Sequence, residues 1–317
     1  SPPPRSGLIM DGIAYLVGVD GGGTKTLVRL ASLHGKTLGQ ASGPGSALRN
    51  GAAHAWRVIG RTIEASFAAA GLKRPADQAL AVGIGIAGEN VAQWSADFRT
   101  MAPAFGALDI VNDGVATLLG AHGGAPGAIV AVGTGTIGLA LDIDGSRRVV
   151  DGWGFPSGDD GSGGWMGLRA LHHAQLALDG RSPRGPLADA VLALCRAELP
   201  AHPGQPARDE RATLLDWLSQ ADQAAFARAA RPVVAQAAND EAARAILQAA
   251  AAEISLMIAT LDPAQRLPLA LCGGLAAALQ AYLDPRQQAR IVAPQADAVD
   301  GALLLAQRAL QAKETPA

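Results

Sequence analysis

The stretch YLVGVDGGGTKT, residues 15–26, carries the strongest structural signal in this sequence. A short run with β-branched residues, 15–20, ends in an acid and three glycines, and this pattern predicts a strand that enters a tight turn. Strand-like composition resumes over residues 26–32, so the glycines are expected to join two antiparallel strands. Residues 37–42 indicate a third strand. The chain is therefore predicted to open with three consecutive strands.

Helices and strands alternate in the pattern that follows. Residues 52–70 have the spacing of an amphipathic helix, and residues 79–86 form an apolar run typical of a buried strand. The next expected elements are a helix, a strand and a helix at residues 91–102, 108–111 and 115–122. From residue 15 to residue 122, the chain is therefore predicted to form three strands followed by alternating helices and strands.

The opening pattern then recurs. Residues 128–132 form an apolar strand, residues 133–136 a turn of glycine and threonine, and residues 137–143 a returning strand. Predicted helices occupy most of 165–261, and a late buried strand is expected at 267–271. The chain is thus predicted to begin the same fold twice. The expected division is a disordered leader, an N-terminal domain and a C-terminal domain with a helical insertion, at residues 1–11, 12–124 and 125–317.

Composition narrows the class of protein. The chain has 317 residues, of which 49% are hydrophobic and 17% charged, which suits a globular protein of two domains. A formal net charge of -2 without a dense basic block gives no sign of nucleic acid or of an anionic membrane as partner. Cys195 and Cys272 stand far apart and in unlike contexts, so no disulfide is expected. No uninterrupted apolar run reaches the roughly 20 residues that span a bilayer, and a cytoplasmic protein is expected.

The two glycine turns suggest phosphate binding. Glycines let backbone N–H groups converge on an anion, and the neighbouring hydroxyls and Lys25 add donors. Asp20, at the strand end, is placed to hold Mg²⁺ through water. Neither turn is a Walker A loop or a dinucleotide fingerprint, because a strand and not a helix follows each of them. A plain glycine-rich hairpin remains the alternative for each turn taken alone.

The order of these motifs resembles the superfamily of ATPases that contains sugar kinases, heat-shock-70 proteins and actin. Residues 20–26 resemble its first phosphate motif, and residues 133–136 resemble its second. Residues 112–114 resemble its first connecting motif, and residues 271–276 resemble its adenosine motif. Residues 20–26 together with 152–164 are similar to the BadF/BadG/BcrA/BcrD-type ATPases and to the N-acetylglucosamine and glucosamine kinases grouped with them. The resemblance covers about residues 15–310 and implies an α/β fold of two ribonuclease-H-like, actin-like ATPase domains with a central cleft.

The resemblance also implies roles for individual residues. Asp113 falls at the position of the family's catalytic base, although the same residue also fits an ordinary turn before a helix. The expected nucleotide contacts are Gly21, Gly22, Gly23, Thr24, Lys25, Thr26, Gly133, Thr134, Gly135, Thr136, Gly273 and Gly274. The expected substrate contacts are Asn112, Asp113, Gly152, Trp153, Asp159, Asp160 and Gly88. Asp160 stands where relatives usually have Glu, and a Ca²⁺ site or an acidic turn is the alternative for its loop.

The resulting hypothesis is an ATP- and Mg²⁺-dependent kinase that phosphorylates the 6-hydroxyl of an amino sugar, N-acetylglucosamine or glucosamine. Two other functions stay open. One is the activator ATPase of a radical dehydratase or reductase, which needs cysteines for an iron–sulfur cluster, and the contexts of Cys195 and Cys272 do not favour it. The other is a nucleotide-dependent switch without catalysis. Relatives are often dimers, so a homodimer is one assembly to test.

Overall fold

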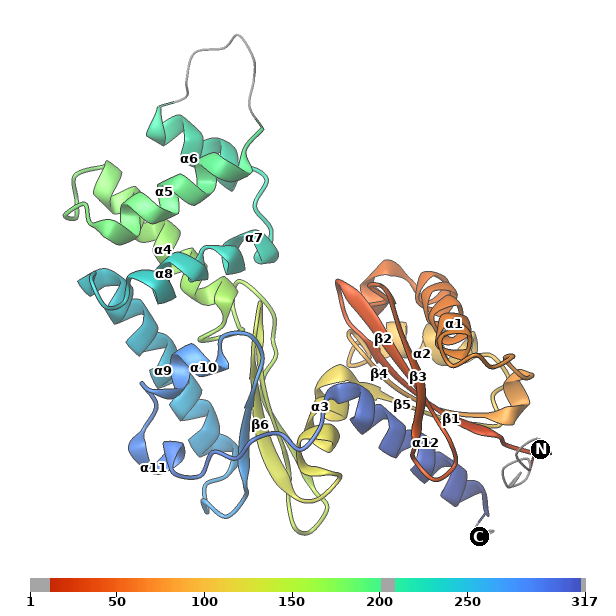
Figure 1. Ribbon diagram of the computed structural model, residues 1–317. Coiled ribbons are helices and arrows are strands. Elements are labelled where there is room, and N and C mark those ends of the chain that lie inside the picture. The colour runs from red at the N-terminus through yellow and green to blue at the C-terminus, as the bar shows by residue number, and fades with distance from the viewer. Residues whose placement is uncertain (1–11, 201–208, 315–317) are drawn as a thin grey trace. The chain divides into compact units, whose positions relative to one another are not determined.

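The structure is a computed structural model that describes residues 12–200 and 209–314. The predicted leader, residues 1–11, lies outside the described residues. Two compact units make up the chain (Figure 1). Of the described residues, unit 1 contains those up to Gly127 and those from Ala293, and unit 2 contains those between Ala128 and Val292.

Unit 1 is built on a five-stranded sheet in the order β3-β2-β1-β4-β5. The strands are β1 (Tyr15–Gly21), β2 (Lys25–Ala31), β3 (Thr37–Pro44), β4 (Leu80–Ile86) and β5 (Ala107–Asn112). The helices are α1 (Ala52–Ala69), α2 (Ala92–Thr100), α3 (Asp113–His122) and α12 (Ala298–Glu314), with short 3-10 helices η1 (Leu48–Asn50) and η2 (Asp77–Ala79). Apart from α12, η1 and η2, each of these elements was expected from the sequence, and its ends lie within two residues of the expected ones.

Alternating residues of β1 serve two separate cores. Val17 and Val19 pack with apolar residues of α1, whereas Leu16 packs on the opposite face with residues of α12. This alternation follows from the two-residue period of a strand. Gly18 and Gly83 permit the close approach of α12, since a Cβ on either one would fall within 2.5 Å of a carbonyl oxygen of that helix. Asp20 continues the face of β1 that looks toward α12.

The C-terminal helix α12 belongs to unit 1. It packs against β1, β4 and α3, and Arg29 of β2 forms ion pairs of 2.9 and 2.6 Å with Asp297 and Asp300 at its start. The sequence pattern placed all residues from 125 to the C-terminus in the second domain. The unit boundaries differ from that division because the chain returns to the first sheet after Val292.

Unit 2 contains a four-stranded sheet in the order β8-β7-β6-β9. Its strands are β6 (Gly127–Val132), β7 (Thr136–Leu141), β8 (Arg147–Asp151) and β9 (Leu269–Cys272). Its helices are α4 (Gly163–Leu178), α5 (Pro186–Glu198), α6 (Glu210–Leu218), α7 (Gln223–Arg228), α8 (Ala230–Gln236), α9 (Glu241–Leu261), α10 (Ala276–Gln280) and α11 (Pro285–Gln288). The strand–turn–strand of β6 and β7 repeats the β1–β2 pattern of unit 1. Strand β8 was not expected from the sequence.

Helix α9 runs through the core of unit 2. By length and composition alone it is apolar enough to cross a membrane. However, Leu247, Ile254 and Ile258 on its buried side belong to a core cluster that also contains residues of the sheet and of the other helices of unit 2. The helix is therefore explained by packing within a globular unit.

Candidate active site

The carboxyl ends of three parallel strands of unit 1 meet at one edge of the sheet. Asp20 of β1 is paired in register with Gly85 of β4, and Ile86 of β4 is paired with Asn112 of β5. The residues that end these strands therefore lie side by side. This edge is where open α/β sheets usually bind ligands, and it gathers Asp20, the turn at Gly88, and Asp113.

The carboxylate of Asp113 contributes to the electrostatic environment of Asp20. Burial raises the pKa of Asp20 from its ordinary value of 3.8 to about 6, with further increases from Asp113 and Asp297 and an opposing decrease from Lys25. Two carboxylates that share a half-buried site disfavour each other's ionised form. A hydrated divalent cation relieves such repulsion, so Asp20 has the chemistry of a metal-holding residue. Among the described residues, no group of three or more His, Cys, Asp or Glu side chains is arranged to hold a metal by itself.

Asp113 is the first residue of helix α3. Asn112 caps the helix by accepting a hydrogen bond of 3.0 Å from the backbone N–H of Gly114, and an Asp113 carboxylate oxygen also lies 3.0 Å from that nitrogen. Burial raises the pKa of Asp113, and the Gly114 N–H lowers it by less. A carboxylate with a raised pKa at a strand end has the properties of a general base. Because Asn112 caps the helix, its side chain already has a structural role.

The first glycine turn is closed by its own backbone. The N–H of Gly22 donates to the carbonyl oxygen of Lys25 at 3.0 Å, and Gly23, Thr24 and Lys25 are exposed at the tip. Thr26 is different, since it is fully buried and its hydroxyl is hydrogen bonded to the carbonyl oxygen of Pro44 at 2.6 Å. The predicted nucleotide contacts of this loop are therefore accessible at the tip, whereas the Thr26 side chain holds the hairpin in place.

A neighbouring segment supports the first turn from behind. Ser46 is fully buried, and its hydroxyl lies 2.7 Å from that of Thr26. An added Cβ on Gly21 would fall 2.6 Å from the Ser46 hydroxyl oxygen, which explains the glycine there. Gly88 has a φ of +93°, and an added Cβ would meet the ring of Trp94 at 3.0 Å. Ser46 and Gly88 are thus part of the packing that shapes this edge of unit 1.

The second glycine turn lies in unit 2, at the equivalent point of its sheet. The N–H of Gly133 donates to the carbonyl oxygen of Gly135 at 2.9 Å, and Thr134 is exposed at the tip. Strands β6 and β9 are parallel neighbours, and Gly273 comes directly after β9. Gly273 lies against the end of β6, because an added Cβ there would be 2.3 Å from the Val132 carbonyl oxygen. The predicted phosphate turn and the predicted adenosine glycines, Gly273 and Gly274, therefore neighbour each other within unit 2.

Asp159 fixes this second turn. It is only 7% exposed, and its carboxylate accepts hydrogen bonds from the Thr136 N–H at 3.2 Å and from the side-chain amide of Gln223 at 2.6 Å. Gln223 also reaches the Thr134 carbonyl oxygen at 3.3 Å. Asp159 was expected to bind substrate, yet both of its oxygens are already bound within unit 2. Gln223 was missed, because nothing in a helix 64 residues away in sequence signals a contact with Asp159.

Asp151 organises the loop that precedes Asp159. Its carboxylate accepts hydrogen bonds from the backbone N–H groups of Trp153, Asp159 and Asp160, at 3.3, 3.0 and 2.7 Å. Gly152 adopts a φ of +76°, which favours glycine. The Trp153 side chain is 87% exposed, as expected of an aromatic group that is free to pack on a ligand. Asp151 is a positioning residue that the sequence did not single out, although an acid before a Gly-Trp-Gly turn is a recognisable signal.

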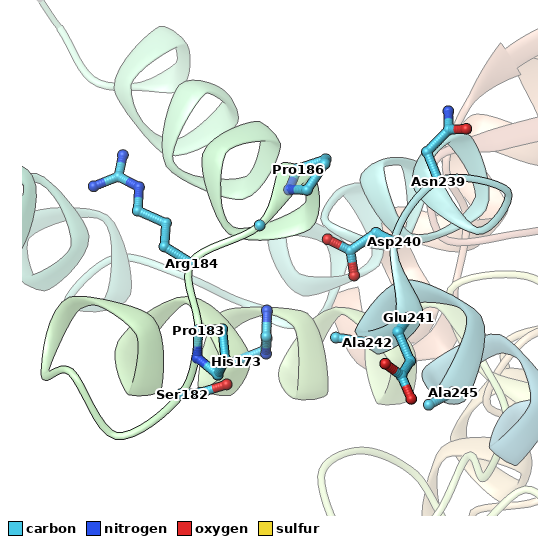
Figure 2. Close-up of a pocket in the computed structure, with 11 residues that line it drawn as sticks. His173, Ser182, Pro183, Arg184, Pro186, Asn239, Asp240, Glu241, Ala242 and Ala245 are labelled. Atoms are coloured by element: carbon cyan, nitrogen blue, oxygen red, sulfur yellow. The ribbon is translucent and has the colours of Figure 1, made fainter.

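A cavity elsewhere in unit 2 contains no predicted site residue. It has a volume of about 440 Å³, and Figure 2 shows the His173 ring between the Ser182–Pro183 backbone and the turn at Asp240–Ala242. The buried Nε2 atom of His173 has no hydrogen-bond partner among the described residues. Asp240, by contrast, caps α9 and accepts the Leu187 N–H at 2.9 Å. Asp240 thus supports the starts of both α5 and α9.

The two cysteines are structural in character. Cys195 is buried, and that burial raises the pKa of its thiol to about 12. Cys272 is half-buried at the end of β9, and burial raises the pKa of this thiol as well. Among the described residues, neither cysteine belongs to a group of three or more His, Cys, Asp or Glu side chains that could hold a metal.

Comparison with known proteins identifies the family. The model of the BadF/BadG/BcrA/BcrD ATPase family matches residues 17–306. The chain belongs to this family. The resemblance inferred from the motifs is thereby confirmed, and ATP is the nucleotide that such a family uses.

Named relatives include kinases of amino sugars. The chain is 31% identical over 294 residues to a glucosamine kinase of Vibrio cholerae, with 92% of this chain and 95% of that protein covered. It is 29% identical over 182 residues to an N-acetylmuramic acid/N-acetylglucosamine kinase of Clostridium acetobutylicum, with 56% of this chain and 59% of that protein covered.

A solved structure supports the fold. A proposed N-acetylglucosamine kinase from Chromobacterium violaceum is 45% identical and superimposes with a TM-score of 0.85, with 93% of this chain and 99% of that chain covered. The predicted fold class, α/β with two actin-like ATPase domains, is confirmed by this likeness.

Proposed function

We propose that this chain is an ATP-dependent kinase that transfers a phosphoryl group to the 6-hydroxyl of an amino sugar. The single observation that carries the proposal is the edge of unit 1, where Asp20, the first glycine turn and Asp113 meet at the ends of parallel strands. Phosphoryl transfer requires little covalent chemistry from the protein beyond an oriented acceptor and neutralised phosphate charge. These residues supply both requirements.

Asp113 is the proposed catalytic base. Its carboxylate is fixed by the start of α3, and burial keeps its pKa above the ordinary value of 3.8. In this role it orients the acceptor hydroxyl and accepts its proton as the bond to phosphorus forms. Gly85 supports the arrangement, because a Cβ there would lie 2.4 Å from the Cβ of Ala116 in α3. A larger residue at position 85 would push α3, and Asp113 with it, out of place.

The two glycine turns are the proposed binding elements for the phosphates of ATP. In unit 1, the exposed tip offers the backbone N–H groups of Gly23 and Thr24 and the ammonium group of Lys25. In unit 2, Thr134 is the exposed donor, and Gly273 and Gly274 are the proposed neighbours of adenosine. Asp20 is proposed to hold Mg²⁺ through water. The cation would neutralise charge on the phosphates during transfer.

The loop that Asp151 organises is the proposed sugar-binding element of unit 2. The exposed Trp153 ring can cover an apolar sugar face, and Asp160 has a carboxylate without a hydrogen bond among the described residues. Asp159 is proposed to act indirectly, by holding the second turn. The acceptor is proposed to be glucosamine or its N-acetyl form, in keeping with the named activities of the relatives.

The proposal is tested by ATP turnover with Mg²⁺ in a coupled assay. The acceptors are glucosamine, N-acetylglucosamine, N-acetylmannosamine, glucose and no sugar. We expect sugar-dependent turnover that falls by about 10³-fold in Asp113→Asn, because a general base contributes roughly 10²- to 10⁴-fold to a rate. Asp97→Asn, at an exposed position of α2 in the same unit, is the matched control and should retain full activity. Full activity in Asp113→Asn would overturn the assignment of the base.

The same assay separates the competing functions. Hydrolysis without sugar would favour an activator ATPase, which should also contain iron when purified. Nucleotide binding without turnover would favour a switch. The kinase is proposed to work in the cytoplasm, and analytical ultracentrifugation would test for a homodimer.

A further inference from the structure

Residues 45–50 are attached to the first glycine turn by their backbone. The N–H groups of Ser46 and Ala47 both donate to the carbonyl oxygen of Gly22, at 3.0 and 3.1 Å. The N–H of Leu48 donates to the carbonyl oxygen of Ala87 at 2.9 Å. The N–H of Ala87 in turn donates to the carbonyl oxygen of Gly21 at 2.9 Å. Side chains carried by η1 are therefore held in a fixed relation to the turn.

Arg49 is the side chain that η1 directs to this turn. Its Nη2 atom lies 3.5 Å from the position that a Cβ on Gly23 would occupy. The residue is exposed, and among the described residues its guanidinium has no hydrogen bond or ion pair. Arg29 of the same unit shows the contrast, because its guanidinium is bound by two carboxylates of the α12 segment.

A free guanidinium beside a glycine turn fits phosphate. Its planar fork of donors matches two phosphate oxygens and remains charged at any physiological pH. Lys25 is a second cation at the same tip, so the exposed side of the turn is positive while Asp20 lies behind it at the strand end. An anion that reaches the backbone N–H groups of the tip would come within range of both cations.

We infer that Arg49 binds the phosphate chain of ATP from unit 1, together with Lys25 and the tip of the first turn. This inference rests on the proposed function, since it assigns a further residue to the nucleotide site. Arg49 belongs to none of the motifs described above, and the backbone attachment of residues 45–50 is what brings it to Gly23.

Equilibrium titration of the full-length protein with MgATP and MgADP tests the inference. We expect Arg49→Gln to weaken ATP binding by about 10- to 100-fold, the range for loss of a charge-assisted hydrogen bond. Arg49→Lys should recover part of that loss, and KM for the sugar should stay near the wild-type value. Arg57→Gln is the control, because Arg57 is an exposed arginine of α1 that also lacks a partner among the described residues.

The outcomes separate this inference from the proposed function. If the wild-type protein fails to bind ATP, the proposed function itself is wrong. If the wild type binds ATP and Arg49→Gln binds it equally well, only the role of Arg49 is wrong. A rise in sugar KM with unchanged ATP affinity would also overturn the inference, because it would place Arg49 against the acceptor. A salt dependence of ATP binding that is weaker in Arg49→Gln than in the wild type would support it.

Discussion

The two glycine turns have similar sequences, since each joins two strands through glycine and threonine residues. They are stabilised by different contacts. In unit 1, the turn lies next to two ionisable side chains. Burial raises the pKa of Asp20 to about 6, and Lys25 is exposed at the tip. In unit 2, the turn is fixed by the buried Asp159, whose oxygens are bound to Thr136 and Gln223. The first turn thus keeps its charged groups for a ligand, whereas the second turn uses its carboxylate for internal support.

This difference suggests that the carboxylates of the two turns have different functions. A carboxylate that remains unpaired in the folded protein costs stability, and it is retained where a ligand or metal later binds. A carboxylate that accepts hydrogen bonds stabilises the fold and orients its neighbours. The chemical step is therefore expected to depend on unit 1, and the second turn is expected to depend on the integrity of Asp159 and its partners.

The largest effect is predicted for Asp20→Asn. The pKa of Asp20 is higher in the folded protein, 6 against 3.8, so the folded state binds the proton more tightly. Stability is therefore lost as the pH rises from about 4 to about 6 and stays low above that. At pH 8 the variant should be more stable than the wild type by up to about 3 kcal/mol, the free energy that corresponds to the change in pKa. Urea unfolding at pH 4 and pH 8 would measure this difference.

At pH 4 the two proteins should be nearly equal in stability, because Asp20 is then mostly protonated when folded. The gain in stability should come with a loss of Mg²⁺-dependent turnover. A variant that is less stable than the wild type at pH 8 would show that Asp20 is paired in the folded protein, and the contrast between the turns would fail.

The second prediction concerns Asp159→Asn. An amide at this position presents an NH₂ group to one of two donors, so at least one of the bonds to Thr136 and Gln223 is lost. We expect a loss of about 2 kcal/mol in the free energy of unfolding, typical of a hydrogen bond to a charged group. Asp160→Asn is the control, since its side chain has no hydrogen bond among the described residues and should change stability by less than about 0.5 kcal/mol. Equal effects at the two positions would contradict the role assigned to Asp159.

Local patterns in the sequence were sufficient to predict most strands and helices and the position of Asp113. A strand that ends in glycines or in Asn-Asp-Gly is a local signal, and the parallel pairing of β1, β4 and β5 then brings those ends together. Strand β8 was missed because it lies at the edge of its sheet and begins with exposed arginines, so it lacks an alternating apolar face. The packing of α12 on unit 1 was missed because it joins residues at opposite ends of the chain.

The internal supports of the site were also beyond prediction from local patterns. Thr26 was predicted to contact the nucleotide because it closes a glycine motif, but its hydroxyl is buried against Pro44 at the end of β3 and against Ser46. The contact of Asp159 with Gln223 links a loop to a distant helix, and the approach of Arg49 to Gly23 depends on backbone hydrogen bonds between segments. Each of these contacts depends on tertiary packing and not on sequence spacing.

The smallest effects are predicted for the two threonines that follow the turns, Thr26 and Thr136. Both are buried, but the Thr26 hydroxyl is hydrogen bonded to Pro44 and Ser46, whereas that of Thr136 has no partner among the described residues. Thr26→Val should lose about 1 to 2 kcal/mol of stability, because the Ser46 hydroxyl would be left buried without that bond. Thr136→Val should be neutral or stabilise by up to about 1 kcal/mol, because it removes an unsatisfied polar group. Parallel urea titrations would compare them. Since the Thr136 hydroxyl is buried, KM for ATP should also be unchanged in Thr136→Val, and a clear rise would place that hydroxyl on the nucleotide after all.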